Sequence, residues 1–378
     1  MRYFICVILF FLIFACILNG DPKTEVPDPT VPIISADEFV RGADLSYTNE
    51  MLECDAQFFS ATGVQFDPYQ IFGDAGTNIA RFRLWHSPTW TAYSNFADVQ
   101  LGIARAKSAG MDILLDFHYS DTWADPSKQE IPAAWLPFAS SPNVLSDSVY
   151  RYTYNVLKKL SVAGLLPQYV QIGNEINIEI LQDPNQSYNL NWNRNAKLIN
   201  SGIQAVRDLS AELDEPVQIM LHIAQPENAL WWFREAAQNG ITDFDWLGVS
   251  YYPAWSTYNL NRLTTAISTL IQTHQKKLMI VETAYPFTLE DADGAGNILG
   301  KEALVPGFPA SENGQFDFMM ALEEVVKNGG GSGIIYWEPA WISTSCYTQW
   351  GQGSHWDNAT LFDASGRALK GMTYFGQP

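Results

Sequence analysis

The stretch Tyr169-Val-Gln-Ile-Gly-Asn-Glu-Ile-Asn177 begins as an apolar, β-branched run and ends abruptly in Asn174 and Glu175. Such a run is typical of a short buried strand that places a carboxylate at its own carboxyl end. A second run, Leu278-Met-Ile-Val-Glu-Thr283, ends in Glu282 in the same way. We expect the two glutamates to meet in one pocket, one as proton donor and the other as nucleophile.

Short β-rich runs alternate with longer segments of helical period from residue 40 onward. The predicted strands are Val40–Ser46, Asn78–Leu84, Asp112–His118, Tyr169–Asn174, Val217–Ile223, Trp246–Tyr251, Leu278–Val281 and Gly333–Trp337. The helical candidates include Phe96–Ala109, Ser146–Ala163, Arg194–Leu213, Leu260–His274 and Gln315–Lys327. This alternation implies a parallel sheet, and eight units close a (β/α)8 TIM barrel. We expect one α/β catalytic domain over residues 37–378, with long loops at the carboxyl ends of the strands.

The composition limits the class of partner. The 378 residues are 47% hydrophobic, which is enough for a large core, and carry 41 acidic against 22 basic side chains, for a net charge of −19. This charge repels nucleic acids and anionic membrane surfaces. We expect a neutral partner and a monomer.

The amino-terminal segment predicts export. Residues 1–19 combine Arg2 with an apolar run too short for a stable membrane span, which is typical of a signal peptide. Cys16, preceded by Ile13-Phe14-Ala15, resembles a lipoprotein cleavage site, and simple removal of the whole signal is the alternative. The Pro-rich residues 20–36 predict a flexible tether. The protein is therefore expected to be extracellular or lipid-anchored at a bacterial cell surface.

Polar residues gather at the carboxyl ends of the predicted strands, where a TIM barrel carries its active site. They are Asp44, Arg81, Arg83, Asp116, His118, Asn174, Glu175, His222, Tyr251, Glu282, Trp337 and Glu338. Because side chains alternate along a strand, Arg81 and Arg83 share one face, as do Asp116 and His118. Consecutive Asn174 and Glu175 can share a site only if their strand ends or bulges there.

Several strings resemble the arabinogalactan endo-β-1,4-galactanases, glycoside hydrolase family 53, between about Gly42 and Gly366. They are Gly42-Ala-Asp-Leu-Ser46, Arg81-Phe-Arg-Leu-Trp85, Asp116-Phe-His-Tyr-Ser-Asp-Thr-Trp-Ala-Asp-Pro126, Gly173-Asn-Glu175, Gly248-Val-Ser-Tyr-Tyr-Pro253, Val281-Glu-Thr283 and Tyr336-Trp-Glu-Pro-Ala-Trp341. The resemblance implies a (β/α)8 barrel that cleaves β-1,4-galactan with retention of configuration. It assigns Glu175 as acid/base and Glu282 as nucleophile.

The chemistry of a retaining glycosidase predicts roles for residues near the two glutamates. The acid requires a pKa raised by burial and by the charge of the nucleophile, while the nucleophile must stay ionised. We expect Arg83 to hold Glu282 ionised and Tyr251 to donate a hydrogen bond to it. Asn174 is expected to bond the sugar 2-hydroxyl.

Some of the remaining candidates for substrate binding have two possible roles. His118 and His222 either bind substrate or are satisfied core histidines, and Asp44 either lines the site or supports loops beneath it. Trp85, Trp337 and Trp341 are expected to stack on sugar rings, whereas Trp135 and Trp350 are expected to pack under loops.

The stretch Asp291-Ala-Asp-Gly-Ala-Gly-Asn297 resembles a calcium loop, with Asp291, Asp293 and Asn297 as candidate ligands. A solvated turn is the alternative, because Ala295 stands where a histidine occurs in related bacterial galactanases. We expect structural calcium and no organic cofactor.

Cys54 follows the first predicted strand and Cys346 the eighth, and these strands are neighbours in a closed barrel. We therefore expect a disulfide between them, with two free thiols as the alternative.

We expect the substrate to be galactan and galacto-oligosaccharides. The competing hypotheses are a retaining β-glycanase that acts on mannan or glucan, and a surface glycan-binding protein without turnover.

Overall fold

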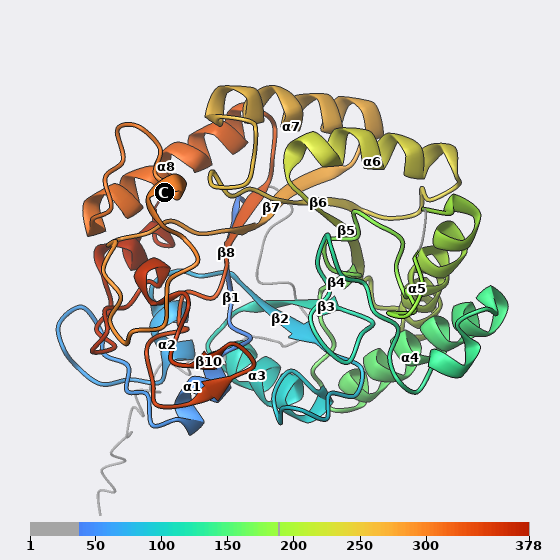
Figure 1. Cartoon of the computed structure of the whole chain (residues 1–378), viewed down its shortest axis with the longest axis horizontal. Coiled ribbons are helices and arrows are strands. Elements are labelled where there is room, and N and C mark those ends of the chain that lie inside the picture. The colour runs from blue at the N-terminus through green and yellow to red at the C-terminus, as the bar shows by residue number, and fades with distance from the viewer. Residues whose placement is uncertain (1–37, 188–189, 378) are drawn as a thin grey trace, which may run out of the picture. The chain divides into compact units, whose positions relative to one another are not determined.

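The computed structural model describes residues 38–187 and 190–377. Eight parallel strands close into a barrel in sequence order, with β8 paired to β1. Figure 1 shows the strands at the centre and the long helices in a ring around them. The strands are β1 Val40–Asp44, β2 Ile79–Leu84, β3 Asp112–Phe117, β4 Tyr169–Ile172, β5 Gln218–Ala224, β6 Trp246–Ser250, β7 Lys277–Thr283 and β8 Gly333–Tyr336. The predicted TIM barrel is confirmed.

Within the described residues, the five helices named from the sequence are present together with three that were not named, and several are capped at the N-terminus. They are α1 Thr48–Glu53, α2 Pro68–Asp74, α3 Phe96–Ser108, α4 Pro142–Val162, α5 Trp192–Leu213, α6 Pro226–Gln238, α7 Leu260–His274 and α8 Glu312–Asn328. Short 3-10 turns are η1 Leu136–Phe138, η2 Lys301–Ala303, η3 Asp357–Ala359 and η4 Lys370–Tyr374. The side chains of Asn95, Asn259 and Ser311 accept backbone N–H groups at the starts of α3, α7 and α8. Gly110 follows α3 with φ +84, a conformation that favours glycine.

The barrel interior changes from apolar to polar along the strands. An apolar cluster contains Val40, Ile79, Leu114, Met220, Trp246, Met279, Val281 and Ile335. Two residues beyond Ile79 lies Arg81, and two beyond Leu114 lies Asp116, both buried. Because alternate residues face the same side, apolar side chains fill one end of the barrel and polar ones the other.

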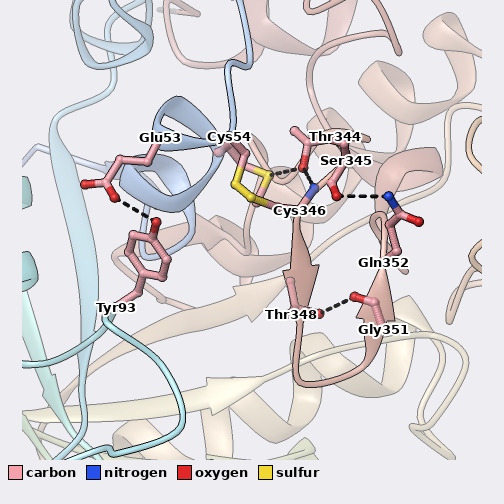
Figure 2. Close-up of a disulfide and its surroundings, with 10 residues drawn as sticks. Glu53, Cys54, Tyr93, Thr344, Ser345, Cys346, Thr348, Gly351 and Gln352 are labelled. Carbon is pink, nitrogen blue, oxygen red and sulfur yellow. Dashed lines mark hydrogen bonds between the residues drawn. A yellow bond between two sulfur atoms is a disulfide. The ribbon is translucent and has the colours of Figure 1, made fainter.

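A hairpin that the sequence did not predict lies in the segment after β8. Its strands are β9 Tyr347–Thr348 and β10 Gly351–Gln352. Figure 2 shows the Cys54–Cys346 disulfide joining the hairpin to the end of α1. The two Cα atoms are 5.7 Å apart, so the predicted bridge is confirmed.

The predicted signal peptide, Cys16 and the tether lie outside the described residues. Within residues 38–187 and 190–377, no helix is both long and apolar enough to cross a membrane.

Candidate active site

A cavity of about 450 Å³ opens at the carboxyl ends of the strands. Its lining includes the polar strand-end residues Asp44, Arg81, Arg83, His118, Asn174, Glu175 and Glu282, together with the aromatic residues Trp123, Tyr252, Trp255, Trp337, Trp341, Trp350 and Trp356. A polar floor surrounded by aromatic rings suits a neutral, ring-shaped ligand.

The backbone after β4 turns two consecutive side chains into this cavity. The strand ends at Ile172, and then Gly173 and Glu175 adopt positive φ angles of +82 and +43. The left-handed conformation is unfavourable for a glutamate and persists only where the surroundings impose it. The regular alternation is broken as expected, and both Asn174 and Glu175 line the cavity.

The two candidate glutamates lie close together. A carboxylate oxygen of Glu175 lies within 4.8 Å of one of Glu282. Retaining glycosidases hold their carboxyl groups about 5–5.5 Å apart, whereas inverting enzymes need about 6.5–9.5 Å to admit a water molecule. The geometry fits direct attack by one carboxylate on the sugar.

Arg81, not Arg83, is the cation that contacts Glu282. Its guanidinium lies 2.7 Å from Glu282 Oε1, 2.7 Å from Asp44 Oδ2 and 2.9 Å from Asp116 Oδ2. It also donates to Asn174 Oδ1 at 2.8 Å. One buried cation therefore joins carboxylates from β1, β3 and β7.

Arg83 has a different partner, so its predicted role is wrong. It forms an ion pair of 2.9 Å with Glu338 and lies over the rings of Tyr47, Trp85 and Trp123, at 4.1 to 4.9 Å from their centroids. Cation–π contacts with three rings hold it in the cavity wall. Arg83 lies two residues further along β2 than Arg81, beyond the reach of Glu282.

The predicted hydrogen bond from Tyr251 to Glu282 is also wrong. The Tyr251 hydroxyl donates to the backbone oxygen of Tyr258 at 3.0 Å. The next residue, Tyr252, lines the cavity instead. Because Ser250 points inward, alternation turns Tyr251 outward and Tyr252 inward.

Burial raises the pKa of both candidate carboxyls. The pKa of Glu175 rises to about 7. Burial also raises the pKa of Glu282 well above its ordinary value, although the Arg81 cation opposes this effect. Two carboxyls this close resist double ionisation, so the pair retains a proton near neutral pH. Arg81 donates to Glu282, whereas Glu175 contacts the Ser250 hydroxyl at 2.6 Å. Because only Glu282 is in direct contact with a cation, the shared negative charge is favoured on Glu282 and the proton on Glu175.

Known proteins similar in sequence include glycoside hydrolases, as the pair of carboxyl groups in this cavity indicates. Residues 40–375 match the model of "Glycosyl hydrolase family 53". The chain belongs to this family. An arabinogalactan endo-β-1,4-galactanase of Cellvibrio japonicus is 52% identical over 96% of this chain and 95% of its own length.

Solved structures of the family share the fold. The GH53 catalytic domain of Ignisphaera aggregans has a TM-score of 0.81 and 32% identity, and covers 93% of this chain and 98% of its own. A structure titled for two fungal β-1,4-galactanases has a TM-score of 0.77 and 30% identity, and covers 90% and 99%.

The two histidines of the family 53 site differ in position. His118 lines the cavity, with Nε2 3.0 Å from Asp116 Oδ2 and Nδ1 accepting the backbone N–H of Ala124. His222 is fully buried behind the cavity, with its ring nitrogens near Asn174 and Ser250. His118 can therefore reach a ligand, whereas His222 acts only through its neighbours.

Trp135 packs against His86 and Tyr152, as expected. Of the three tryptophans expected to stack on sugar rings, Trp337 and Trp341 line the cavity, but the Trp341 ring is only 1% exposed and is stacked on Tyr47. Trp85 is only 2% exposed, touches Arg83, and lines a smaller neighbouring cavity, so it is not part of the main cavity wall. Trp350 is 52% exposed and lines the main cavity, so its assignment to loop packing is wrong.

Arg81 has the role that the sequence predicted for Arg83, and two other inward residues were not predicted as site residues. Ser250 occupies an inward position of β6, and alternation from its neighbours was the available signal. Tyr252 follows from the same alternation. Gln171 is a buried amide within the apolar run of β4, where it accepts from Arg81 and donates to Asp116. A polar residue in such a run indicates an internal partner.

The calcium-like loop brings some of its predicted residues together. The Asn297 amide donates to Asp291 Oδ1 at 2.6 Å and to Asp357 Oδ1 at 2.9 Å. The Asn297 Oδ1 is buried and has no hydrogen-bond partner in the described part of the chain. Asp293 instead accepts the backbone N–H groups of Ala295 and Ser354. Turning the Asn297 amide over would direct three oxygen atoms to one point, an arrangement that fits a hard cation.

Proposed function

We propose that this protein hydrolyses β-1,4-galactan at internal linkages, with retention of configuration. The observation that carries the proposal is the pair Glu175 and Glu282, with carboxylate oxygens within 4.8 Å in one barrel-mouth cavity. Membership of family 53 supports galactan as the substrate, because curated relatives are named arabinogalactan endo-β-1,4-galactanases.

The chemistry follows from the two environments. Glu282, held as an anion by Arg81, attacks the anomeric carbon, while Glu175 gives its proton to the departing glycosidic oxygen. Glu175, now a carboxylate, takes a proton from a water molecule. As that proton is removed, the water oxygen attacks the same carbon, displaces Glu282 and releases the sugar with its original configuration.

The cavity walls suit a polysaccharide. Trp255 and Trp350 are about half exposed at the cavity, and Trp123 and Trp337 also line it. Aromatic faces pack against the apolar C–H faces of sugars, so these rings are expected to bind successive galactose units. An endo mode requires such binding on both sides of the cleaved bond.

The first prediction concerns the catalytic pair. Glu175→Gln and Glu282→Gln should each lower kcat on galactan by at least about 10²-fold, because the acid and the nucleophile are lost. The measurement is release of reducing sugar, with circular dichroism to verify folding. Glu235→Gln, on α6 where Glu235 pairs with Arg234 away from the cavity lining, is the matched control and should retain full activity.

The same assay separates the competing functions. Wild-type protein should act on galactan and be much slower on mannan and glucan. A preference for mannan or glucan would replace the proposed substrate, and binding of galactan without cleavage would indicate a glycan-binding protein. Full activity in both glutamine variants would refute the mechanism.

We also propose that Asp291, Asn297 and Asp357 hold structural calcium, with Asp293 fixing the loop. The second prediction is that chelation lowers Tm and that added calcium restores it, because a bound ion stabilises only the folded state. Asp291→Asn should abolish this dependence, whereas Asp147→Asn on α4 should preserve it. An unchanged Tm with chelator and with calcium would identify the loop as a simple turn.

We also propose that residues 1–19 are a signal peptide that directs export of the protein. Incorporation of labelled palmitate that is lost in Cys16→Ala would establish a lipid anchor. Secretion without incorporation would indicate simple signal cleavage.

A further inference from the structure

A chain of hydrogen bonds leads from the acid/base carboxyl into the barrel. Glu175 Oε1 lies 2.6 Å from Ser250 Oγ, and Ser250 Oγ lies 2.7 Å from His222 Nε2. His222 Nδ1 lies 2.9 Å from Asn174 Oδ1. Ser250 and His222 are fully buried, so their hydrogens must go to these partners.

The orientation of Asn174 fixes one end of the chain. Its Nδ2 donates to the backbone oxygen of Ala124 at 2.8 Å, and its Oδ1 accepts from the Arg81 guanidinium at 2.8 Å. Turning the amide over would set its N–H groups against a cation and its oxygen against a carbonyl. Asn174 therefore presents an acceptor to His222 Nδ1, and that nitrogen must carry the hydrogen.

The His222 ring is neutral. Burial, reinforced by the Arg81 charge, lowers the pKa of His222 well below its ordinary value. A neutral imidazole carries one hydrogen, so with Nδ1 protonated, Nε2 is an acceptor. Two donors also approach Nδ1, Gln171 Nε2 at 3.1 Å and the Glu175 backbone N–H at 3.4 Å, but both are more distant than Asn174. Gln171 Nε2 also has a shorter bond, of 2.7 Å, to Asp116.

The Ser250 hydroxyl has a single hydrogen to give. If that hydrogen goes to His222 Nε2, the Ser250 oxygen is free to accept, and Glu175 Oε1 must be the donor. This requires a protonated Glu175. When Glu175 is ionised, its carboxylate and His222 compete for the one hydrogen, and one of them loses its bond.

We propose that Ser250 and His222 are positioning residues that hold the acid proton on Glu175 in the resting enzyme. When Glu175 protonates the leaving group, an O–H bond of Glu175 breaks and an O–H bond of the leaving sugar forms. The Ser250 hydrogen then rotates from His222 to the new carboxylate. No other proton moves, and the sequence reverses when Glu175 takes a proton from water.

Charged groups from other elements also act on Glu175. Burial is the main cause of the raised pKa of Glu175, and a hydrogen bond donated by Ser250 would lower that pKa. Asp125, in the loop after β3, and Asp116 on β3 favour the protonated form, and Arg81 on β2 favours the ionised form. Glu282 faces Glu175 from β7 within 4.8 Å. These groups determine the pKa of Glu175 in the wild-type protein. Substitutions at Ser250 and His222 should shift the pKa from that value.

The first experiment determines the His222 tautomer in the wild-type protein. Nitrogen-15 NMR of histidine-labelled enzyme at about pH 5 should show His222 with protonated Nδ1 and unprotonated Nε2. Signals that vanish in His222→Phe assign the residue, and if that variant does not fold, signals that shift in Ser250→Ala assign it instead. A protonated Nε2 at this pH would overturn the proposal.

The second experiment measures how kcat/KM on galactan depends on pH, and in particular the alkaline limb of that profile. In wild type, kcat/KM should fall as pH rises through about 7, the value to which the pKa of Glu175 is raised. His222→Phe frees the Ser250 hydrogen for the carboxylate and should move the limb to lower pH by about 0.5 to 1 unit, the size of one hydrogen bond. In Ser250→Ala, adding His222→Phe should produce no further shift.

His274→Phe on the outer helix α7 is the matched control and should leave the limb in place. A limb that stays fixed or moves to higher pH in His222→Phe would overturn the proposal, because it would mean that Ser250 is an ordinary donor to Glu175. The kinetic experiment rests on the proposed function, whereas the tautomer does not. Full activity of Glu175→Gln would therefore refute the proposed function. The hydrogen-bond chain would still be tested by the NMR experiment.

Discussion

At the scale of single residues, Arg81 determines the electrostatics of the site. Its side chain is 1% exposed and contacts Asp44, Asp116 and Glu282, all of them buried. Charges are costly to bury unless each has a partner of opposite charge. One guanidinium therefore makes it possible for several strand-end carboxylates to occupy a single cavity.

The third prediction follows from this arrangement. Arg81→Met should lower the free energy of unfolding by about 3–5 kcal/mol, because buried carboxylates lose their cation, and should abolish activity. Urea unfolding and reducing-sugar release measure the two effects. Arg105→Met is the matched control: its pair with Asp67 is partly exposed, and its loss should cost no more than about 1 kcal/mol. Equal losses in the two variants would contradict this role for Arg81.

At the scale of elements, the hairpin β9–β10 completes the cavity. It carries Trp350 to the cavity wall, where the ring lies 6.5 Å from that of Trp123. The disulfide from Cys346 to Cys54 fixes the base of this hairpin to α1 (Figure 2). The position of a cavity-lining ring thus depends on a covalent link to a residue near the start of the barrel.

The fourth prediction tests the hairpin. Trp350→Ala should raise KM for galactan by about 2–10-fold with little change in kcat, because it removes one stacking contact, worth about 0.5–1.5 kcal/mol, remote from the reacting carboxyls. Removing the disulfide with Cys54→Ala and Cys346→Ala should raise KM in the same direction. Trp231→Ala, exposed on α6, is the matched control. A loss confined to kcat would show that the hairpin acts on the chemistry.

At the scale of the whole molecule, an acidic chain concentrates buried carboxyls at one end of its barrel. Burial raises the pKa of Glu50 and of Glu175 to about 7, from an ordinary value of 4.5. Between these pH values the folded protein binds more protons than the unfolded chain. The stability that these groups contribute is complete below about pH 4.5 and is lost as pH rises through 7.

The fifth prediction is that the free energy of unfolding falls from pH 5 to pH 8. Each raised pKa contributes at most about 3 kcal/mol to this fall. Urea unfolding at several pH values measures it, and Glu50→Gln should flatten the slope. Asp147→Asn, exposed on α4, should leave the slope unchanged. The lowered pKa of His222 acts in the opposite direction up to about pH 6.5, so the comparison with Glu50→Gln decides: an identical slope in the two proteins would show that Glu50 is ionised in the folded state.

The sequence by itself determined the barrel, the two glutamates and the family. These depend on local pattern, because apolar runs, helical periods and strand-end carboxylates are readable one segment at a time. It also placed the disulfide, since β1 and β8 must be neighbours once the barrel closes.

Only the tertiary structure decided which side chains meet inside the barrel. Arg81 and Arg83 share a face of β2, but the stagger of neighbouring strands directs Arg81 to Glu282 and Arg83 to Glu338. His222 stands out along the chain only as a strand-end histidine and Ser250 does not stand out at all, because their link to Glu175 exists only across β4, β5 and β6. The stagger of the strands and the partners that each side chain reaches depend on the packing of the whole barrel. They therefore cannot be predicted from any single segment of the sequence.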